Sequence, residues 1–268
     1  IARRLVALAG AAVGHMRGGL GQVNIAASML FGGISGSAAA DTSAIGGLMI
    51  PQMAERGYGR DYAVNITVTS SIIALMLPPS HNLIIYSLAA GGRLSIADLF
   101  TAGIIPGIIL AVSLMISAWF VARRRGYPTE PFPGARAALF LLINAAPGLI
   151  LVAIIFGGVR SGVFTASESS CIAVIYAIAV TLLVYRSLPW SEFVAATMHA
   201  VRTSSMVLLV IGAAAAFGWL LAYLRVPADL VTWLKGVSDN PIVILLLLNL
   251  ILLLLGTFMD MSPLIVIT

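Results

Sequence analysis

Five apolar runs, each about as long as a bilayer-spanning helix needs to be, decide what this chain can fold into. They occupy residues 62–87, 102–121, 138–158, 169–185 and 203–223. The chain is 60% hydrophobic and only 9% charged, so it cannot cover itself with the charged surface of a soluble domain. The sequence therefore predicts an all-α polytopic membrane protein.

Composition also argues against several other classes. Cys171 is the single cysteine, which excludes an internal disulfide and a thiolate metal site. The basic residues stand in short loops, with no basic patch interleaved with aromatics, so we expect no nucleic-acid partner. The chain begins at Ile1 and ends at Thr268 inside an apolar run, and we expect it to be a piece of a longer protein.

The basic residues predict an orientation in the membrane. Two further apolar stretches, 18–54 and 240–268, are interrupted by "GISGSAAAD" and "GTFMDMSP". Whether 18–54 is a re-entrant hairpin or two full spans, threading places most basic residues on one side, which the positive-inside rule makes cytoplasmic. This side holds Arg3, Arg4, Arg17, Arg56, Arg60, Arg123, Arg124, Arg125, Arg136, Arg186 and Arg202. The amphipathic stretches 186–202 and 226–237, and residues 1–17, are expected to lie along the interface or to brace other helices.

An internal repeat relates the two interrupted stretches. An offset of 225 residues places Asn24 on Asn249 and Ser37 on Ser262 without a gap. Threading puts the two copies in opposite orientations, an arrangement typical of secondary transporters with a site at the midplane. We predict a first repeat over 1–137, containing an arm helix, the hairpin 18–54, the broken helix 62–87 and the helix 102–121. The second repeat covers 138–268 and stops within its hairpin.

The sequence "LPPSHN" (77–82) interrupts one of the apolar runs. Its two prolines remove backbone donors, and hydrocarbon offers no water to replace them. Freed carbonyls at this break, with the hydroxyls that precede it, would form an all-oxygen site for a hard cation opposite the tip of the first hairpin. The predicted cation-binding residues are Ser35, Gly36, Ser37, Thr69, Ser70, Ser71, Leu77 and Pro78.

The hairpin tips predict a second group of ligands. Ser262-Pro263 and Ser37 are read as helix N-caps, whose orphan amides and positive dipole ends could hold a carboxylate beside the cation. No lysine or arginine lies between Arg17 and Arg56 to take that role. The residues predicted for substrate or a second cation are Asp260, Met261, Ser262 and Ser80.

These motifs resemble a known family. "FGGISGSAAADTSAIGGLMIPQMAERGY", "LPPS", "SIADLFTAGIIPG", "GGVRSGVFTASES" and "GTFMDMSP" are similar to the large membrane subunit of tripartite ATP-independent periplasmic (TRAP) transporters, the DctM family. The resemblance implies a sodium-coupled, elevator-type carrier with re-entrant hairpins in a bacterial or archaeal inner membrane. It implies a small TRAP membrane subunit and an extracytoplasmic solute-binding protein as partners, and a carboxylate-bearing organic anion as substrate. Sodium ions would be the only metal, with no further cofactor. The second broken helix is expected beyond Thr268.

Two departures from the family's pattern stand out. Ala74-Leu75 replaces Gly-Pro before the prolines, which predicts a less disrupted helix, and Ala166 replaces a proline within residues 164–168. Thr165 and Glu168 fit a capping box. Asp41, in the first turn of a half-helix, suits either a dipole-stabilising or a cation-binding role.

Other functions are carried as alternatives. "GISG" (33–36) matches the motif of rhomboid-type intramembrane proteases, with Ser35 as nucleophile and His81 as the nearest candidate base. Another hairpin-type sodium/anion symporter and an uncoupled channel are the remaining alternatives. The preferred prediction is a transporter that is not an enzyme.

Overall fold

The computed structural model describes residues 2–186, 189–237, 240–259 and 261–267. Every regular element in these residues is helical, which confirms the predicted all-α class. The chain forms two compact units, each described by itself below. One comprises Ile1–Ser87 and Gly92–Ser187, and the other Leu88–Gly91 and Leu188–Thr268. The repeat boundary at 137/138 concerns internal symmetry and stays a prediction.

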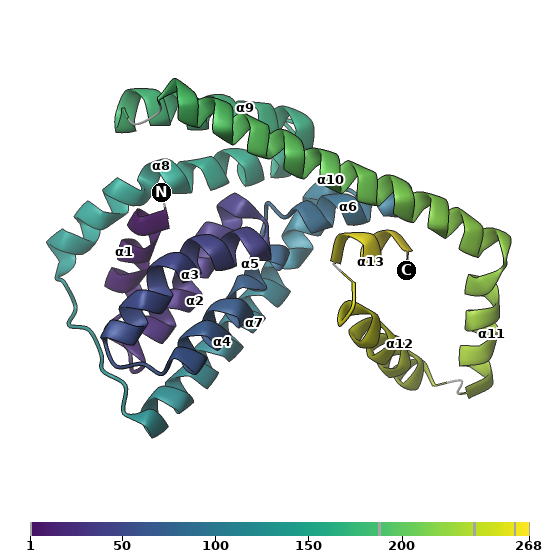
Figure 1. The fold of residues 1–268 in the computed structure, drawn as a ribbon, viewed down its shortest axis with the longest axis horizontal. Coiled ribbons are helices and arrows are strands. Elements are labelled where there is room, and N and C mark those ends of the chain that lie inside the picture. The colour runs from purple at the N-terminus through teal and green to yellow at the C-terminus, as the bar shows by residue number, and fades with distance from the viewer. Residues whose placement is uncertain (1, 187–188, 238–239, 260, 268) are drawn as a thin grey trace. The chain divides into compact units, whose positions relative to one another are not determined.

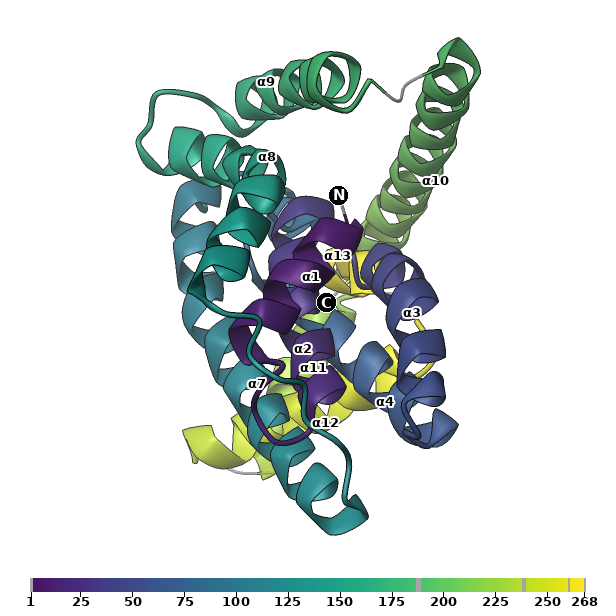
Figure 2. The ribbon, with the colours of Figure 1, turned by 90° about the vertical axis from the view of Figure 1, so that its left-hand side faces the viewer.

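The first unit is built around α2. Its helices are α1 (Ala2–Val13), α2 (Gly19–Ser35), α3 (Ala38–Glu55), α4 (Arg60–Ser71), α5 (Ile73–Met76), α6 (His81–Ala89), α7 (Ile96–Arg125), α8 (Ala135–Arg160) and α9 (Ala166–Ala179), which continues as a π-helical turn, Val180–Tyr185. α2 packs against α1, α3, α4, α5, α7 and α8 (Figure 1). Figure 2 shows it between α7 and α4, with α1 across it. A helix enclosed in this way must satisfy its polar groups within the protein.

The five predicted spans are confirmed as helices of suitable length and apolarity. Four are continuous: Ile96–Arg125, Ala135–Arg160, Ala166–Tyr185 and Trp190–Tyr223. The fifth is the bent pair Arg60–Met76 and His81–Ala89, whose halves meet at 49° across the Pro-Pro break. The stretch 18–54 forms two helices, α2 and α3, that pack together and are joined by Gly36 and Ser37. The chain is thus a multi-pass membrane protein with a broken helix and a helical hairpin.

Local signals explain where these helices begin and end. Ser95 caps α7 by accepting from the Asp98 amide at 3.4 Å. Thr165 and Glu168 form the predicted capping box: the Thr165 hydroxyl accepts from the Glu168 amide, and the Glu168 carboxylate accepts from the Thr165 amide at 2.8 Å. The replacement of a proline by Ala166 therefore leaves the start of α9 intact.

A tyrosine cluster closes the base of the hairpin. The Tyr58 and Tyr127 rings stack with centroids 4.2 Å apart, and Tyr62 lies 5.2 Å from Tyr127. The Tyr58 hydroxyl accepts from the Leu20 amide at 3.2 Å and donates to the Pro128 carbonyl at 3.0 Å. Burial raises the pKa of Tyr58, so the phenol keeps the proton it donates. These contacts tie α2 and the α3–α4 turn to the segment that follows α7.

The second unit contains α10 (Trp190–Tyr223), α11 (Val226–Val237), α12 (Pro241–Gly256) and α13 (Met261–Ile267). α13 packs against α10 and α12. The expectation of a separate amphipathic element over 186–202 is wrong, because residues 190–223 form one helix with no proline inside it. Residues 226–237 form a helix, α11, and their interfacial or bracing role stays a prediction.

Candidate functional site

The tip of the first hairpin consists of two residues. Gly36 ends α2 in the left-handed region (φ 58°) and donates its N–H to the Gly32 carbonyl at 2.8 Å. Ser37 then caps α3, accepting from the Ala40 amide at 3.4 Å as predicted. The tip therefore places the last carbonyls of one helix beside the first amides of the next.

The break in the spanning helix leaves carbonyls without helical donors. Pro78 and Pro79 have no N–H to offer to the carbonyls of Ala74 and Leu75, four residues earlier. The Leu75 carbonyl accepts instead from the Ser80 hydroxyl, at 2.7 Å. Ala74 is fully buried and its carbonyl receives no such replacement among the hydrogen bonds of the described residues. One of the carbonyls expected to be free, that of Leu75, thus accepts a hydrogen bond from Ser80.

The tip lies directly against this break, which confirms the predicted juxtaposition. The Gly36 carbonyl accepts from His81 Nδ1 at 2.6 Å. A Cβ added to Gly36 would lie 2.5 Å from the Pro79 oxygen, and one added to Gly32 would lie 2.7 Å from the Ala74 Cα. Glycines here allow the two backbones to approach each other closely.

The three predicted hydroxyls do not converge on the tip. Thr69 is exposed and donates to the Asn65 carbonyl of its own helix at 2.7 Å, and Ser71 donates to the Val68 carbonyl at 2.8 Å. Ser70 is fully buried and donates to the Asn24 side-chain oxygen at 3.2 Å. The prediction that all three face one site is wrong, because consecutive positions on a helix point about 100° apart.

Sequence reasoning missed a buried polar network between α2 and α4. Asn24 donates to the Thr67 hydroxyl at 2.7 Å, and the Ser28 and Ser70 hydroxyls lie 3.1 Å apart. All four side chains are fully buried. Their spacing offered a signal: Asn24 and Ser28 are four residues apart, and Thr67 and Ser70 three apart, so each pair lies on one face of its helix.

Asp41 is the acid of the hairpin. It is 0% exposed, and neither carboxylate oxygen has a hydrogen-bond partner among the described residues. The Ser28 side chain lies beside the carboxylate without meeting hydrogen-bond geometry. At the start of α3 the Ala40 amide donates to the Ser37 hydroxyl and not to Asp41. The Asp41 carboxylate therefore does not cap the helix by a hydrogen bond.

The second predicted group is only partly described. Asp260 lies outside the described residues. α13 begins at Met261, so Ser262 is its second residue and not the residue before it, contrary to the predicted cap. Met261 is exposed and Ser262 is buried.

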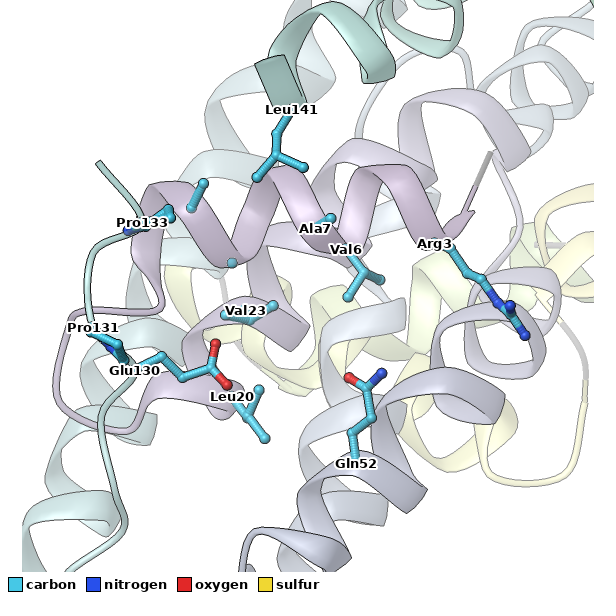
Figure 3. A pocket seen from close by; sticks show the side chains of 12 residues that line it. Arg3, Val6, Ala7, Leu20, Val23, Gln52, Glu130, Pro131, Pro133 and Leu141 are labelled. Atoms are coloured by element: carbon cyan, nitrogen blue, oxygen red, sulfur yellow. The ribbon is translucent and has the colours of Figure 1, made fainter. Parts of the chain in front are cut away.

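Of two pockets in the first unit, one borders the site and the other does not. One lies beside the break, where Gly33, Leu77 and Pro78 meet Val152 and Phe156 of α8, and is mostly apolar. The other lies between α1, α2, α3 and the segment before α8, with Arg3, Gln52 and Glu130 in its wall (Figure 3). No tip or break residue lines this second pocket, and its Glu130 pairs with Arg56 at 3.3 Å.

The protease alternative finds no support in this geometry. The Ser35 hydroxyl accepts from the Ser37 amide at 3.5 Å. His81 directs Nδ1 at the Gly36 carbonyl, and no hydrogen bond joins it to Ser35 among the described residues. A nucleophilic serine needs a base within hydrogen-bond reach.

Comparison with known proteins identifies the family. The family model of the tripartite ATP-independent periplasmic transporter DctM component matches residues 1–268. The chain is 45% identical over 267 residues to the uncharacterized protein YgiK of Salmonella typhimurium, covering 100% of this chain and 61% of that protein. It is 39% identical over 260 residues to the sialic acid TRAP transporter large permease SiaM of Vibrio cholerae, covering 97% and 60%. It is 34% identical over 267 residues to the C4-dicarboxylate TRAP transporter large permease DctM of Pseudomonas aeruginosa, covering 100% and 62%.

The chain thus spans less than two thirds of the length of each of these relatives. The match extends over the hairpin, the break and the spans that position them. The chain belongs to the DctM family of TRAP transporter large permeases, which are transport proteins and not enzymes.

Proposed function

We propose that this chain works in sodium-coupled transport of a carboxylate-bearing organic anion across a bacterial or archaeal inner membrane. Its partners are a small TRAP membrane subunit and an extracytoplasmic solute-binding protein that delivers the substrate. Relatives named for sialic acid and for C4-dicarboxylates support an anionic substrate, since both solutes are carboxylic acids.

The observation that carries this proposal is the seating of the hairpin tip on the broken helix. The Gly36 carbonyl meets His81 at one point of this contact, and Gly32 meets the backbone of Ala74 at another. The ends of both segments carry backbone carbonyls without helical donors, and a hard cation with oxygen ligands is a fitting occupant for such groups inside a membrane. From the predicted set, this arrangement favours the backbone of the tip and of Leu77 and Pro78 over the three hydroxyls.

The same tip supports a site for the carboxylate. The first amides of α3 lie at the positive end of its dipole, with Ser37 occupying only the Ala40 amide. Residues 18–55 contain no lysine or arginine. The anion would therefore be held by backbone amides and by the bound cation, which couples the binding of one to the binding of the other.

We propose that the hairpin is re-entrant and that it moves with the broken helix as one body in an elevator motion. Its tight contacts with α4 and α5 and the tyrosine cluster at its base support a rigid unit. The repeats over 1–137 and 138–268 would supply the two halves of the site, the second around Asp260, Met261 and Ser262.

Uptake by the complete permease, reconstituted with both partners in proteoliposomes, tests the proposal. Labelled sialic acid and a labelled C4-dicarboxylate serve as probes. Uptake of one of them is expected only with an inward sodium gradient. Equal uptake with potassium in place of sodium would overturn the coupling.

A further inference from the structure

The two residues that follow the prolines, Ser80 and His81, donate hydrogen bonds to both sides of the candidate site. The Ser80 hydroxyl donates a hydrogen bond to the Leu75 carbonyl of the break at 2.7 Å. The adjacent His81 donates from Nδ1 to the Gly36 carbonyl of the tip at 2.6 Å. Two neighbouring residues thus donate to the two segments, the break and the hairpin tip, whose backbones lie against each other. The His81 contact is the only one of the two that crosses from the broken helix to the hairpin.

The chemistry of this contact requires a proton on one ring nitrogen of His81. A carbonyl can only accept a hydrogen bond, so His81 Nδ1 must carry a proton and donate it. The acceptor belongs to Gly36, the residue whose left-handed conformation turns the chain from α2 into α3. A donor at this point therefore fixes the direction of the tip peptide and the position of the whole turn.

We propose that His81 is a positioning residue that holds the hairpin tip in register with the break, so that carbonyls from both segments stay within reach of one cation. This inference rests on the proposed sodium coupling. His81 does not need to touch the cation, because it acts through the Gly36 peptide. The consequence is specific: loss of the donor weakens sodium binding more than it slows the transport cycle.

Two substitutions of equal size separate the donor from the bulk of the ring. His81→Asn keeps an N–H close to the position of Nδ1, whereas His81→Leu has the same branched shape without a donor. In His81→Leu the sodium concentration for half-maximal uptake is expected to rise about fivefold, as for loss of one hydrogen bond. The maximal rate should stay within about twofold, and His81→Asn should restore most of the sodium affinity.

A second readout does not depend on coupling. In a background where serine replaces Cys171 and every other cysteine of the complete permease, a cysteine at half-buried Ala38 reports how readily the tip opens, through its rate of labelling by a thiol reagent. His81→Leu should label faster than the parent, and His81→Asn at the parent's rate. If the parent transports without sodium but this difference persists, the proposed function fails and the positioning role stands. Equal behaviour of the asparagine and leucine variants in both measurements would overturn the inference.

Discussion

The two hairpins that the repeat aligns differ in the hydrogen bonds of their matching asparagines, Asn24 and Asn249. Asn24 of α2 donates across the interface to Thr67 of α4, whereas Asn249 of α12 donates to the Leu245 carbonyl of its own helix at 2.9 Å. Most of α2 is buried, while no residue of α12 is. The first hairpin, α2 and α3, packs against the broken helix α4–α5. Among the described residues, no broken helix packs against α12 and α13. Under the proposed function, the first hairpin can contribute to a site because a broken helix contacts its tip.

The sequences of the two helices already reflect this difference. α2 carries glycines where neighbours approach: a Cβ on Gly21 would lie 2.6 Å from the Tyr62 hydroxyl, and one on Gly32 would meet Ala74. α12 is rich in leucine, with a single asparagine in its middle. Small and polar residues serve helix–helix contacts inside membranes, whereas leucine is as stable in lipid as in protein.

The largest expected effect comes from closing the space at the tip. Gly36→Ala puts a methyl group 2.5 Å from the Pro79 oxygen and strains a left-handed residue. We expect it to abolish uptake and to lower the free energy of unfolding by about 2 kcal/mol or more. Uptake assays and denaturation of the purified permease measure both. Gly47→Ala in α3 is the matched control, since nothing lies within 4 Å of its added Cβ. Similar losses in both variants would contradict the tight contact.

The next prediction compares the asparagines. Asn24→Ala leaves Thr67 and Ser70 without their shared partner and should cost about 1–3 kcal/mol of unfolding free energy. If the second hairpin meets its own broken helix in the complete permease, as the inverted repeat requires, Asn249→Ala should cost a similar amount. Thermal unfolding of both variants tests this. If Asn24→Ala lowers the unfolding free energy and Asn249→Ala leaves it unchanged, the result would contradict the proposed structural repeat.

Asp41→Asn separates two roles for the hairpin's acid. Because the carboxylate is buried without a hydrogen-bond partner, its neutral replacement should leave the unfolding free energy unchanged, or raise it by up to about 2 kcal/mol. A role in stabilising the helix dipole predicts the opposite, a loss of about 0.3–1 kcal/mol. Denaturation without sodium decides between them.

The smallest effect concerns the base of the hairpin. Tyr58→Phe keeps the stack on Tyr127 but removes the hydroxyl that links Leu20 to Pro128. We expect a loss of about 1 kcal/mol in unfolding free energy and unchanged sodium dependence of uptake. A changed sodium dependence would show that the base also controls the tip.

The parts of the fold that follow from one segment at a time could be predicted. Apolar length sets the five spans, and the missing N–H groups of Pro78 and Pro79 set the break. The absence of proline from residues 190–223 could have shown one helix there. The site was harder, because its contacts cross between helices. Nothing local shows that Asn24 meets Thr67 or that His81 reaches Gly36.

Sodium-dependent stabilisation of a variant without the break tests the cation site most directly. In Pro78→Ala/Pro79→Ala, the new N–H groups can bond to the carbonyls of Ala74 and Leu75, so the helix should be at least as stable as the parent's without sodium. Thermal unfolding of both proteins is measured across a range of sodium concentrations, with potassium as control. The parent's unfolding temperature should rise with sodium, and the double variant's should not. A parent-like rise in the double variant would contradict a cation site built from the broken helix.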